Sequence, residues 1–173
     1  MSKIYYAKPD QTYQEHFDYV LSAWQDVRIA KQNLVERLAR KYDFEAERFW
    51  QSSLLCVVLH DFGKMTANFQ EMMDALKNGR RFDFQKNYRH ELASFLFVIV
   101  SGKKLATDYG LLSAAPVESL AVVGHHKPLN PALSSFDREG WSPVPQFAQE
   151  GLEQAFNLAK QAFKQQFPEI YLR

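Results

Sequence analysis

Apolar side chains recur at helical spacing near the start of the chain, and this pattern constrains the fold more than any other. Between residues 12 and 40 they lie mostly three, four or seven positions apart, at Phe17, Val20, Leu21, Trp24, Val27, Leu34 and Leu38. Such spacing gathers side chains on one face of a helix, and that face must be buried against other elements. The sequence therefore predicts a long amphipathic helix that ends near Lys41-Tyr42-Asp43.

Apolar runs and helix-terminating residues predict further helices along the chain. The second, over 44–60, ends apolar on nearly every side and so belongs in the middle of a bundle. Gly63 is predicted to end it, and Thr66 to cap a third helix that reaches Asn78-Gly79. Later helices are expected over 88–101, 116–124 and 146–166, with loops over 80–87 and 127–145. No convincing strand pattern appears, so the expected fold is an all-α bundle, a single domain over 1–173.

Composition limits the possible environments and partners. Hydrophobic residues make up 46% and charged residues 24%, which is ordinary for a globular protein. The formal net charge of +1 means that any contact with a polyanion must come from a local patch. The single cysteine, Cys56, excludes an intrachain disulfide and is expected to be a small core residue. No run approaches the ~20 apolar residues of a membrane span, and no signal peptide is evident, so a cytoplasmic protein without membrane contact is expected.

Four of the five histidines fall where helices are predicted to begin or end, and the fifth is His16. His60 is followed by Asp61 at the end of the most apolar helix, His90 begins another, and His125 and His126 end a third. Helix ends at one pole of a bundle can point their side chains into a shared cavity. A charged aspartate at the end of so apolar a helix would be costly unless it were paired or bound to a metal.

Imidazole and carboxylate groups together suit borderline transition metals such as Mn, Fe, Co, Ni or Zn. With five histidines and a bridging aspartate, two ions about 3.5–4 Å apart are plausible. The adjacent pair His60-Asp61 can serve both, because neighbouring helical side chains diverge by about 100°. In the alternative interpretation, His60 and Asp61 form a hydrogen-bonded pair at a helix end and the other histidines are scattered.

The string His60-Asp61-Phe62-Gly63-Lys64 adds a lysine close to the expected metals. Gly63 is expected to free the backbone to turn sharply, so that Lys64 lies one short turn away. A lysine there could hold a scissile phosphate or stabilise charge that develops in the transition state. The alternative is a solvated lysine at a helix start, where the helix dipole disfavours a positive charge.

These residues together resemble the HD nuclease domain of the CRISPR-associated helicase-nuclease of type I interference. The resemblance covers residues 16–126, and its specific features are the order of the motifs and the adjacent histidine pair. The motifs are His16, then His60-Asp61-x-Gly63-Lys64, then His90-Glu91-x-x-Ser94, then His125-His126, with Thr66, Phe69 and Gln70 extending the second.

The resemblance implies an HD-superfamily helical bundle with its metal site at helix ends. It implies cleavage of single-stranded DNA with one or two divalent ions (Mn, Ni, Co, Fe or Mg), Asp61 and Lys64 being catalytic. His16, His60 and Asp61 would hold one ion. Asp61, His90, His125 and His126 would hold the second. The implied partners are a helicase domain or subunit and a CRISPR RNA-guided targeting complex.

The sequence departs from the family pattern in one carboxylate. The family has a further aspartate on a later helix, whereas beyond His126 the only aspartate here is Asp137, in the predicted loop. The helix expected over 146–166 offers Glu150 and Glu153 instead. Two explanations stay open: the chain is an N-terminal fragment of a longer helicase-nuclease, which we favour, or its first metal site is depleted.

The sequence constrains the substrate contacts and the choice between functions less tightly than it constrains the metal ligands. Arg89, beside His90, and Lys127, beside His126, could line a path for the DNA backbone, with Lys77, Arg80, Arg81 and Lys86. An ordinary solvated loop is the alternative for each of these. Two other functions remain: an HD phosphohydrolase acting on free or cyclic nucleotides, and a non-catalytic module that docks a helicase onto a targeting complex.

Overall fold

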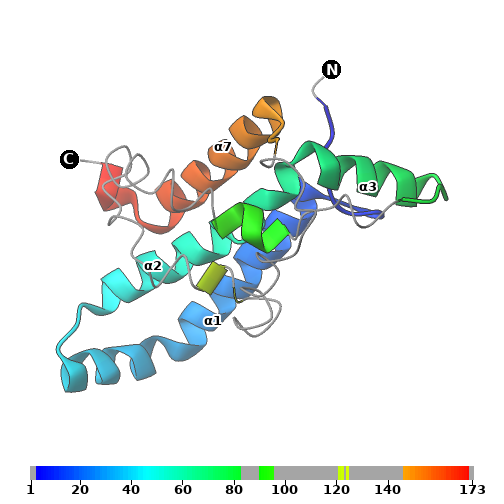
Figure 1. Ribbon diagram of the computed structural model, residues 1–173. Helices are drawn as coiled ribbons and strands as arrows, with labels where there is room; N and C mark the ends of the chain where they lie inside the picture. The colour runs from blue at the N-terminus through cyan, green and yellow to red at the C-terminus, as the bar shows by residue number, and fades with distance from the viewer. Residues whose placement is uncertain (1–2, 83–89, 96–120, 123, 125–145, 172–173) are drawn as a thin grey trace.

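The computed structural model describes residues 3–82, 90–95, 121–122, 124 and 146–171, and within them the chain is almost entirely helical (Figure 1). The helices are α1 (Tyr13–Tyr42), α2 (Ala46–Leu59), the 3-10 helix η1 (Phe62–Met65), α3 (Ala67–Lys77), α7 (Gln149–Gln166) and the 3-10 helix η4 (Pro168–Tyr171). Residues 90–95 are also helical. The prediction of an all-α fold is confirmed.

The helices α1 and α2 lie side by side and run in opposite directions, and α7 packs against α2 and η1 (Figure 1). A capping box starts α1: the Thr12 hydroxyl accepts a hydrogen bond from Glu15 N at 3.2 Å, and the Glu15 carboxylate accepts one from Thr12 N at 2.8 Å. Asp43, with a φ of 54°, ends α1 where the sequence predicted a break. The capping box at Thr12 and Glu15 fixes the first turn of α1, which carries His16.

Two short strands precede α1 and correct the prediction that no strand forms. The strands β1 (Tyr6–Lys8) and β2 (Gln11–Thr12) pair antiparallel around Pro9-Asp10. Segments of three and two residues are too short to produce the alternating pattern by which strands are identified from sequence.

The buried face of α1 differs from the predicted one over its second half. Val27, Leu34 and Leu38 are exposed, whereas the buried residues of the helix are Tyr13, Phe17, Trp24, Val35 and Ala39. At about 100° per residue, the predicted residues beyond Trp24 lie roughly 40–80° to one side of it around the helix, whereas Val35 and Ala39 lie roughly 20–60° to the other side. The observed stripe passes from Trp24 to Val35 in eleven residues, about three full turns. Arg28 lies between them, with its guanidinium 5.5 Å from the Trp24 ring centroid.

This register predicts different effects for one substitution at two positions of α1. Val35→Ala should lower the free energy of unfolding by about 1.5–2 kcal/mol, from about 0.8 kcal/mol per buried methylene, because Val35 is 5% exposed. Val27→Ala should change it by less than about 0.5 kcal/mol, because Val27 is 53% exposed. Urea unfolding of the two variants measures the difference. A larger loss at Val27 would contradict the observed register.

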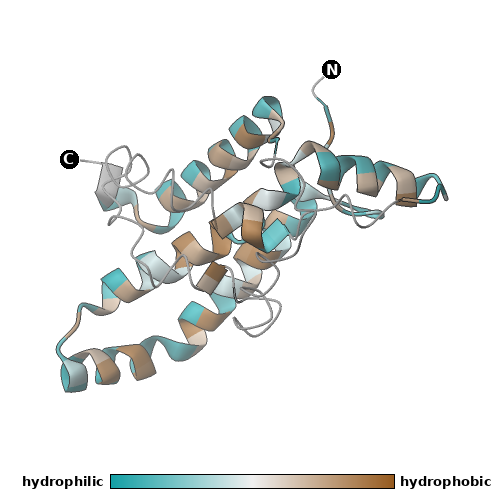
Figure 2. Cartoon of the chain, viewed as in Figure 1, coloured by the Kyte–Doolittle hydropathy of each residue, from teal (hydrophilic) through white to brown (hydrophobic). Residues whose placement is uncertain are grey.

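The core forms around the apolar end of α2, as the sequence predicted. Leu54, Leu55, Val58 and Leu59 are buried there, and Figure 2 shows the hydrophobic stretch along this helix. Trp24 meets Trp50 and Phe167 edge-on, at centroid distances of 6.2 and 6.3 Å. Cys56 is partly buried. None of the helices among the described residues combines the length and the apolar character needed to cross a bilayer.

Candidate metal centre

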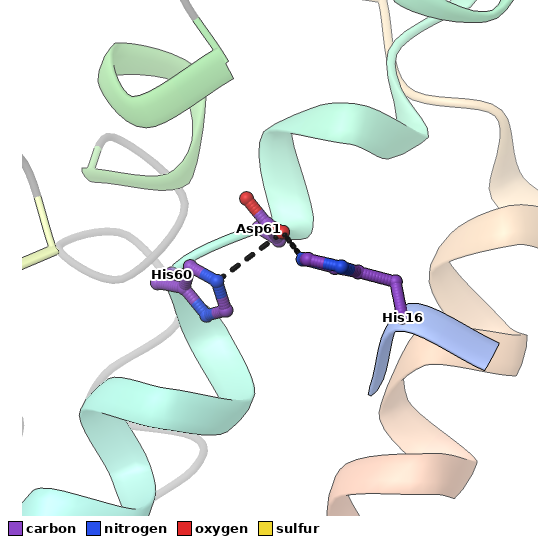
Figure 3. A group of neighbouring side chains, drawn as sticks. All are labelled: His16, His60 and Asp61. Atoms are coloured by element: carbon purple, nitrogen blue, oxygen red, sulfur yellow. Dashed lines mark ion pairs between the residues drawn. The ribbon is translucent and has the colours of Figure 1, made fainter. Parts of the chain in front are cut away.

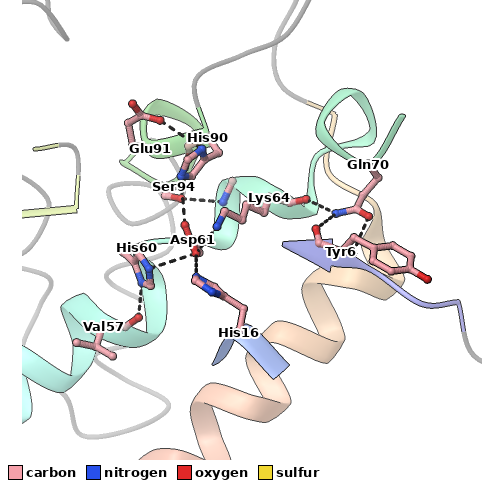
Figure 4. Close-up of polar contacts among 11 residues, drawn as sticks. Tyr6, His16, Val57, His60, Asp61, Lys64, Gln70, His90, Glu91 and Ser94 are labelled. Carbon is pink, nitrogen blue, oxygen red and sulfur yellow. Dashed lines mark hydrogen bonds and ion pairs between the residues drawn. The ribbon is translucent and has the colours of Figure 1, made fainter. Parts of the chain in front are cut away.

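Four predicted site residues come together from three parts of the fold. His16 lies near the start of α1, and His60 and Asp61 directly follow α2. His90 begins the helical segment 90–95. Their side chains converge on the Asp61 carboxylate (Figures 3 and 4). Among the described residues, the structure thus places these four side chains together.

The two oxygens of Asp61 face different histidines. Oδ2 lies 2.6 Å from His16 Nε2 and 3.2 Å from His60 Nε2. Oδ1 lies 3.2 Å from His90 Nε2. His16, His60 and Asp61 each offer one ligand atom, and these atoms lie within 4.8 Å of one another. Two imidazoles and one carboxylate form a donor set that suits a divalent transition metal.

The hydrogen bond of His60 Nδ1 indicates whether a cation fits between His60 Nε2 and the Asp61 carboxylate. Nδ1 lies 2.6 Å from the carbonyl oxygen of Val57, which can only accept, so Nδ1 carries a proton. Nε2 is therefore the nitrogen that faces the Asp61 carboxylate, as a hydrogen-bond donor when the ring is protonated and as a metal ligand when it is neutral. Two acceptors face each other favourably only with a cation between them, either a proton or a metal ion. Fixing one ring nitrogen on a backbone carbonyl is also how metal-binding histidines are commonly oriented.

Asp61 is held as an anion in the interior of the protein. Its exposed fraction is 2%. Burial raises the pKa of its carboxyl group, but the hydrogen bonds from His16, His60 and His90 outweigh burial and hold that pKa well below its usual range. Burial raises the pKa of the nearby Tyr13 phenol well above its usual value, and the negative charge of Asp61 adds to this shift.

Lys64 is buried beside Asp61, so the alternative of a solvated lysine is wrong. Lys64 is only 6% exposed, and its Nζ donates a hydrogen bond to Asp61 Oδ2 at 2.7 Å. Gln70 holds the backbone of this turn, because its Nε2 donates to the carbonyl oxygens of Lys64 at 2.8 Å and Tyr6 at 2.9 Å. The amide of Tyr6 donates in return to Gln70 Oε1 at 3.0 Å. Sequence reasoning placed Gln70 in the motif without finding this role.

The turn that carries Lys64 is anchored to α7. Phe62 is fully buried and meets Phe156 edge-on, with ring centroids 5.3 Å apart. The amide of Ala148 donates to the Met65 carbonyl at 2.9 Å. These contacts hold the turn that follows α2 against α7 and the residue before it.

Two predictions about this turn have the wrong physical reason. Gly63 does not use a left-handed conformation, since Gly79 alone among the described glycines has a positive φ. Gly63 is instead required by close approach, because a Cβ atom there would lie 1.8 Å from the carbonyl oxygen of His90. Thr66 does occupy the N-cap position of α3, but its hydroxyl donates to the Gly63 carbonyl at 2.9 Å and does not cap the helix.

Contacts on two sides hold the His90 ring. Phe69 meets it edge-on at a centroid distance of 5.7 Å. Its Nδ1 lies 3.4 Å from the carboxylate of Glu91, which is itself buried. Glu91 and Ser94 were part of the predicted motif, but a sequence pattern alone did not reveal that both are buried beside the site.

Several predicted site residues lie outside the described part of the chain, namely His125, His126, Arg89 and Lys127. Asp137 also lies outside it. The described helix α7 buries a face of small residues and one phenylalanine, whereas Glu150 and Glu153 are exposed. Thus α7 contributes no buried carboxylate that could stand for the missing family aspartate.

The comparison with protein families decides the membership of the chain. The family model described as "Cas3, HD domain" matches residues 17–171. The chain belongs to this family. It is thus a CRISPR-associated HD domain, from a family of metal-dependent hydrolases and nucleases, and HD domains bind divalent metals. No curated protein and no solved structure matches the chain.

The donor set predicts that a divalent ion stabilises the fold. Mn²⁺ at about a hundred times its dissociation constant should add about 2.7 kcal/mol of stability. For a chain of this size that corresponds to a rise in Tm of about 5–10 °C. Thermal unfolding with and without Mn²⁺ measures it, and excess chelator should reverse it. An equal rise in His60→Ala would show that Mn²⁺ binds elsewhere.

Proposed function

We propose that residues 1–173 form a single metal-dependent nuclease domain that hydrolyses phosphodiester bonds of single-stranded DNA in CRISPR type I interference. The observation that carries the proposal is the buried Asp61 carboxylate, which faces imidazole nitrogens on both of its oxygens. An anion so placed suits a centre that concentrates positive charge on a phosphate group. The family membership supports the same chemistry.

Ligand roles follow from the way in which Asp61 divides its contacts. His16 and His60 lie at Oδ2 and would share one ion with it. His90 lies at Oδ1 and would belong to a second ion, with His125 and His126 supplying further nitrogens. A carboxylate that uses its two oxygens separately can bridge two ions.

A bound divalent ion would ease the loss of a proton from the attacking water and would stabilise the charge that develops on the leaving oxygen. The chain supplies the positioning and the remaining charge. Lys64 would contact the scissile phosphate, because its ammonium group already lies at the carboxylate around which the ions would gather. His60, fixed by Val57, would present the same ring nitrogen throughout the reaction. None of these roles requires a covalent bond between enzyme and DNA.

The substrate and partners complete the proposal. A helicase, as a domain of a longer chain or as a separate subunit, would supply single-stranded DNA, and an RNA-guided CRISPR complex would recruit it. Arg89 and Lys127 would contact the DNA backbone near His90 and His126, where a local positive patch could offset the near-zero net charge of the chain.

Three substrates separate this function from its rivals. The chain is incubated with circular single-stranded DNA, a deoxynucleoside triphosphate and a cyclic nucleotide, each with Mn²⁺, Ni²⁺ or Mg²⁺. We expect the circle to be cut and the free nucleotides to persist. His16→Ala should remove the cutting, whereas Gln14→Ala, an exposed position on the same helix, should retain it.

The other outcomes identify the rival functions. Hydrolysis of a nucleotide without cutting of the circle would support an HD phosphohydrolase and overturn the nuclease proposal. No hydrolysis with any metal, together with helicase binding that His16→Ala leaves intact, would support a docking module. The lack of a buried carboxylate on the described face of α7 is the observation that keeps this last function open.

A further inference from the structure

Ser94 joins the two backbone segments that carry Asp61 and His90. Its hydroxyl accepts a hydrogen bond from the amide of Gly63 at 2.7 Å and donates one to the carbonyl of His90 at 2.9 Å (Figure 4). Donation to the carbonyl four residues earlier is a common use of serine within a helix. Here it leaves an oxygen lone pair of Ser94 for the turn that follows Asp61.

The same two segments touch through their main chains. Gly63 lies so close to His90 that a Cβ atom would overlap the carbonyl oxygen that Ser94 also contacts. Ser94 is fully buried, so water does not replace its hydroxyl as the acceptor for the Gly63 amide. The turn and the helical segment are therefore held together by one hydroxyl at a place where no side chain separates them.

This contact sets the distance between two groups of predicted ligands. Asp61 lies two residues before Gly63, and His90 starts the helical segment that contains Ser94. Between them, Asp61 Oδ1 and His90 Nε2 lie 3.2 Å apart. Metal–ligand distances are tolerant to only about 0.2 Å. A small separation of the two backbones would therefore weaken an ion bound by both residues.

We propose that Ser94 is a positioning residue for metal binding: its hydroxyl locks the His90 segment onto the Asp61 turn so that both can hold the same ion. This inference rests on the proposed function, since it concerns the ion that Asp61 and His90 would share. Ser94 does not itself contact that ion in this scheme. It acts through the backbone of Gly63 and His90.

The test is a calorimetric titration of the full chain with Mn²⁺. His90→Ala first identifies the binding event that involves His90, because that event should disappear. Ser94→Ala should weaken the same event by roughly ten- to a hundredfold, which is the usual effect of removing a group that orients a metal ligand. Any event carried by His16 and His60 should be largely unchanged.

Ser53 provides a matched control elsewhere in the bundle. Its hydroxyl likewise accepts one hydrogen bond, from Trp24 Nε1 at 2.9 Å, and donates one to the carbonyl of Trp50 at 2.9 Å. Ser53→Ala should lower Tm without changing the affinity for Mn²⁺. If Ser94→Ala does not fold, Ser94→Cys replaces it, because a thiol fills similar space with a much weaker hydrogen-bonding group; the affinity should again fall.

The results separate this inference from the proposed function. Unchanged Mn²⁺ affinity in a folded Ser94→Ala or Ser94→Cys chain would show that Ser94 has only a structural role and would overturn the inference alone. An equal loss of affinity in Ser53→Ala would also overturn it. Failure of the unmodified chain to bind Mn²⁺ would contradict both the inference and the proposed function.

Discussion

Replacing Asp61 by asparagine is expected to abolish Mn²⁺ binding and reduce DNA cleavage to the level of a reaction without protein. An amide carries no negative charge, so it can neither attract the ions nor bridge them. The same substitution should lower the free energy of unfolding by about 3–5 kcal/mol in the absence of metal, the usual effect of breaking a buried ion pair from one side. The buried Lys64 ammonium would lose the carboxylate that lies 2.7 Å from it.

Asp18→Asn is the matched control, since Asp18 lies on the exposed face of α1 and contacts Gln14. This variant should keep the stability, the Mn²⁺ affinity and the activity of the unmodified chain. Urea unfolding, calorimetry and cleavage of circular DNA measure the three properties. Full activity in Asp61→Asn would contradict both the proposed metal centre and the proposed mechanism.

Replacing Gly63 by alanine is expected to destabilise the chain by at least about 3 kcal/mol, the upper part of the range for overpacked sites. The new Cβ atom would lie 1.8 Å from the His90 carbonyl oxygen, and this obstacle is backbone, which cannot rotate aside. Relief of the overlap must separate the Gly63 turn from the His90 segment. We therefore expect weaker Mn²⁺ binding as well, measured by thermal unfolding and calorimetry.

A second glycine distinguishes this close approach from a general effect of adding a methyl group. Gly79 has a φ of 64° and no atom near the position of a Cβ. Gly79→Ala should cost about 1–2 kcal/mol through the left-handed backbone alone, and it should leave Mn²⁺ binding intact. A loss at Gly63 no larger than the loss at Gly79 would contradict the geometry described for the turn.

The partners of the buried aspartate were easier to predict from the sequence than the face of α1 that is buried. A histidine next to an aspartate, at the end of a helix apolar on nearly every side, implies a buried charge that needs partners. The structure brings His16, His60 and His90 to that charge. Helix-end position indicated His60 and His90, whereas His16 was implied by the family resemblance alone. Residue type and helix position indicate that such a carboxylate needs partners, because burying it alone is costly, but they do not identify every partner.

Other features depend on contacts that no local pattern records. Beyond Trp24 on α1, the Arg28 guanidinium lies 4.6 Å from the Phe167 ring centroid, near the other end of the sequence. Glycine is required at position 63 because the backbone of His90, which lies much later in the sequence, leaves no space for a Cβ atom. The burial of Lys64 against Asp61 was likewise not deducible from its place in the motif. Such pairings arise only when distant segments pack.

The ion pair between Lys64 and Asp61 bears on the order in which the chain folds and binds metal. A carboxylate already balanced by an ammonium group can be buried while the chain folds, without waiting for a metal ion. The protein therefore differs from small zinc domains, whose folding free energy is supplied by the metal. If the metal centre forms as proposed, folding can precede metal loading, and a bound ion would add to a stability that the chain already has without it.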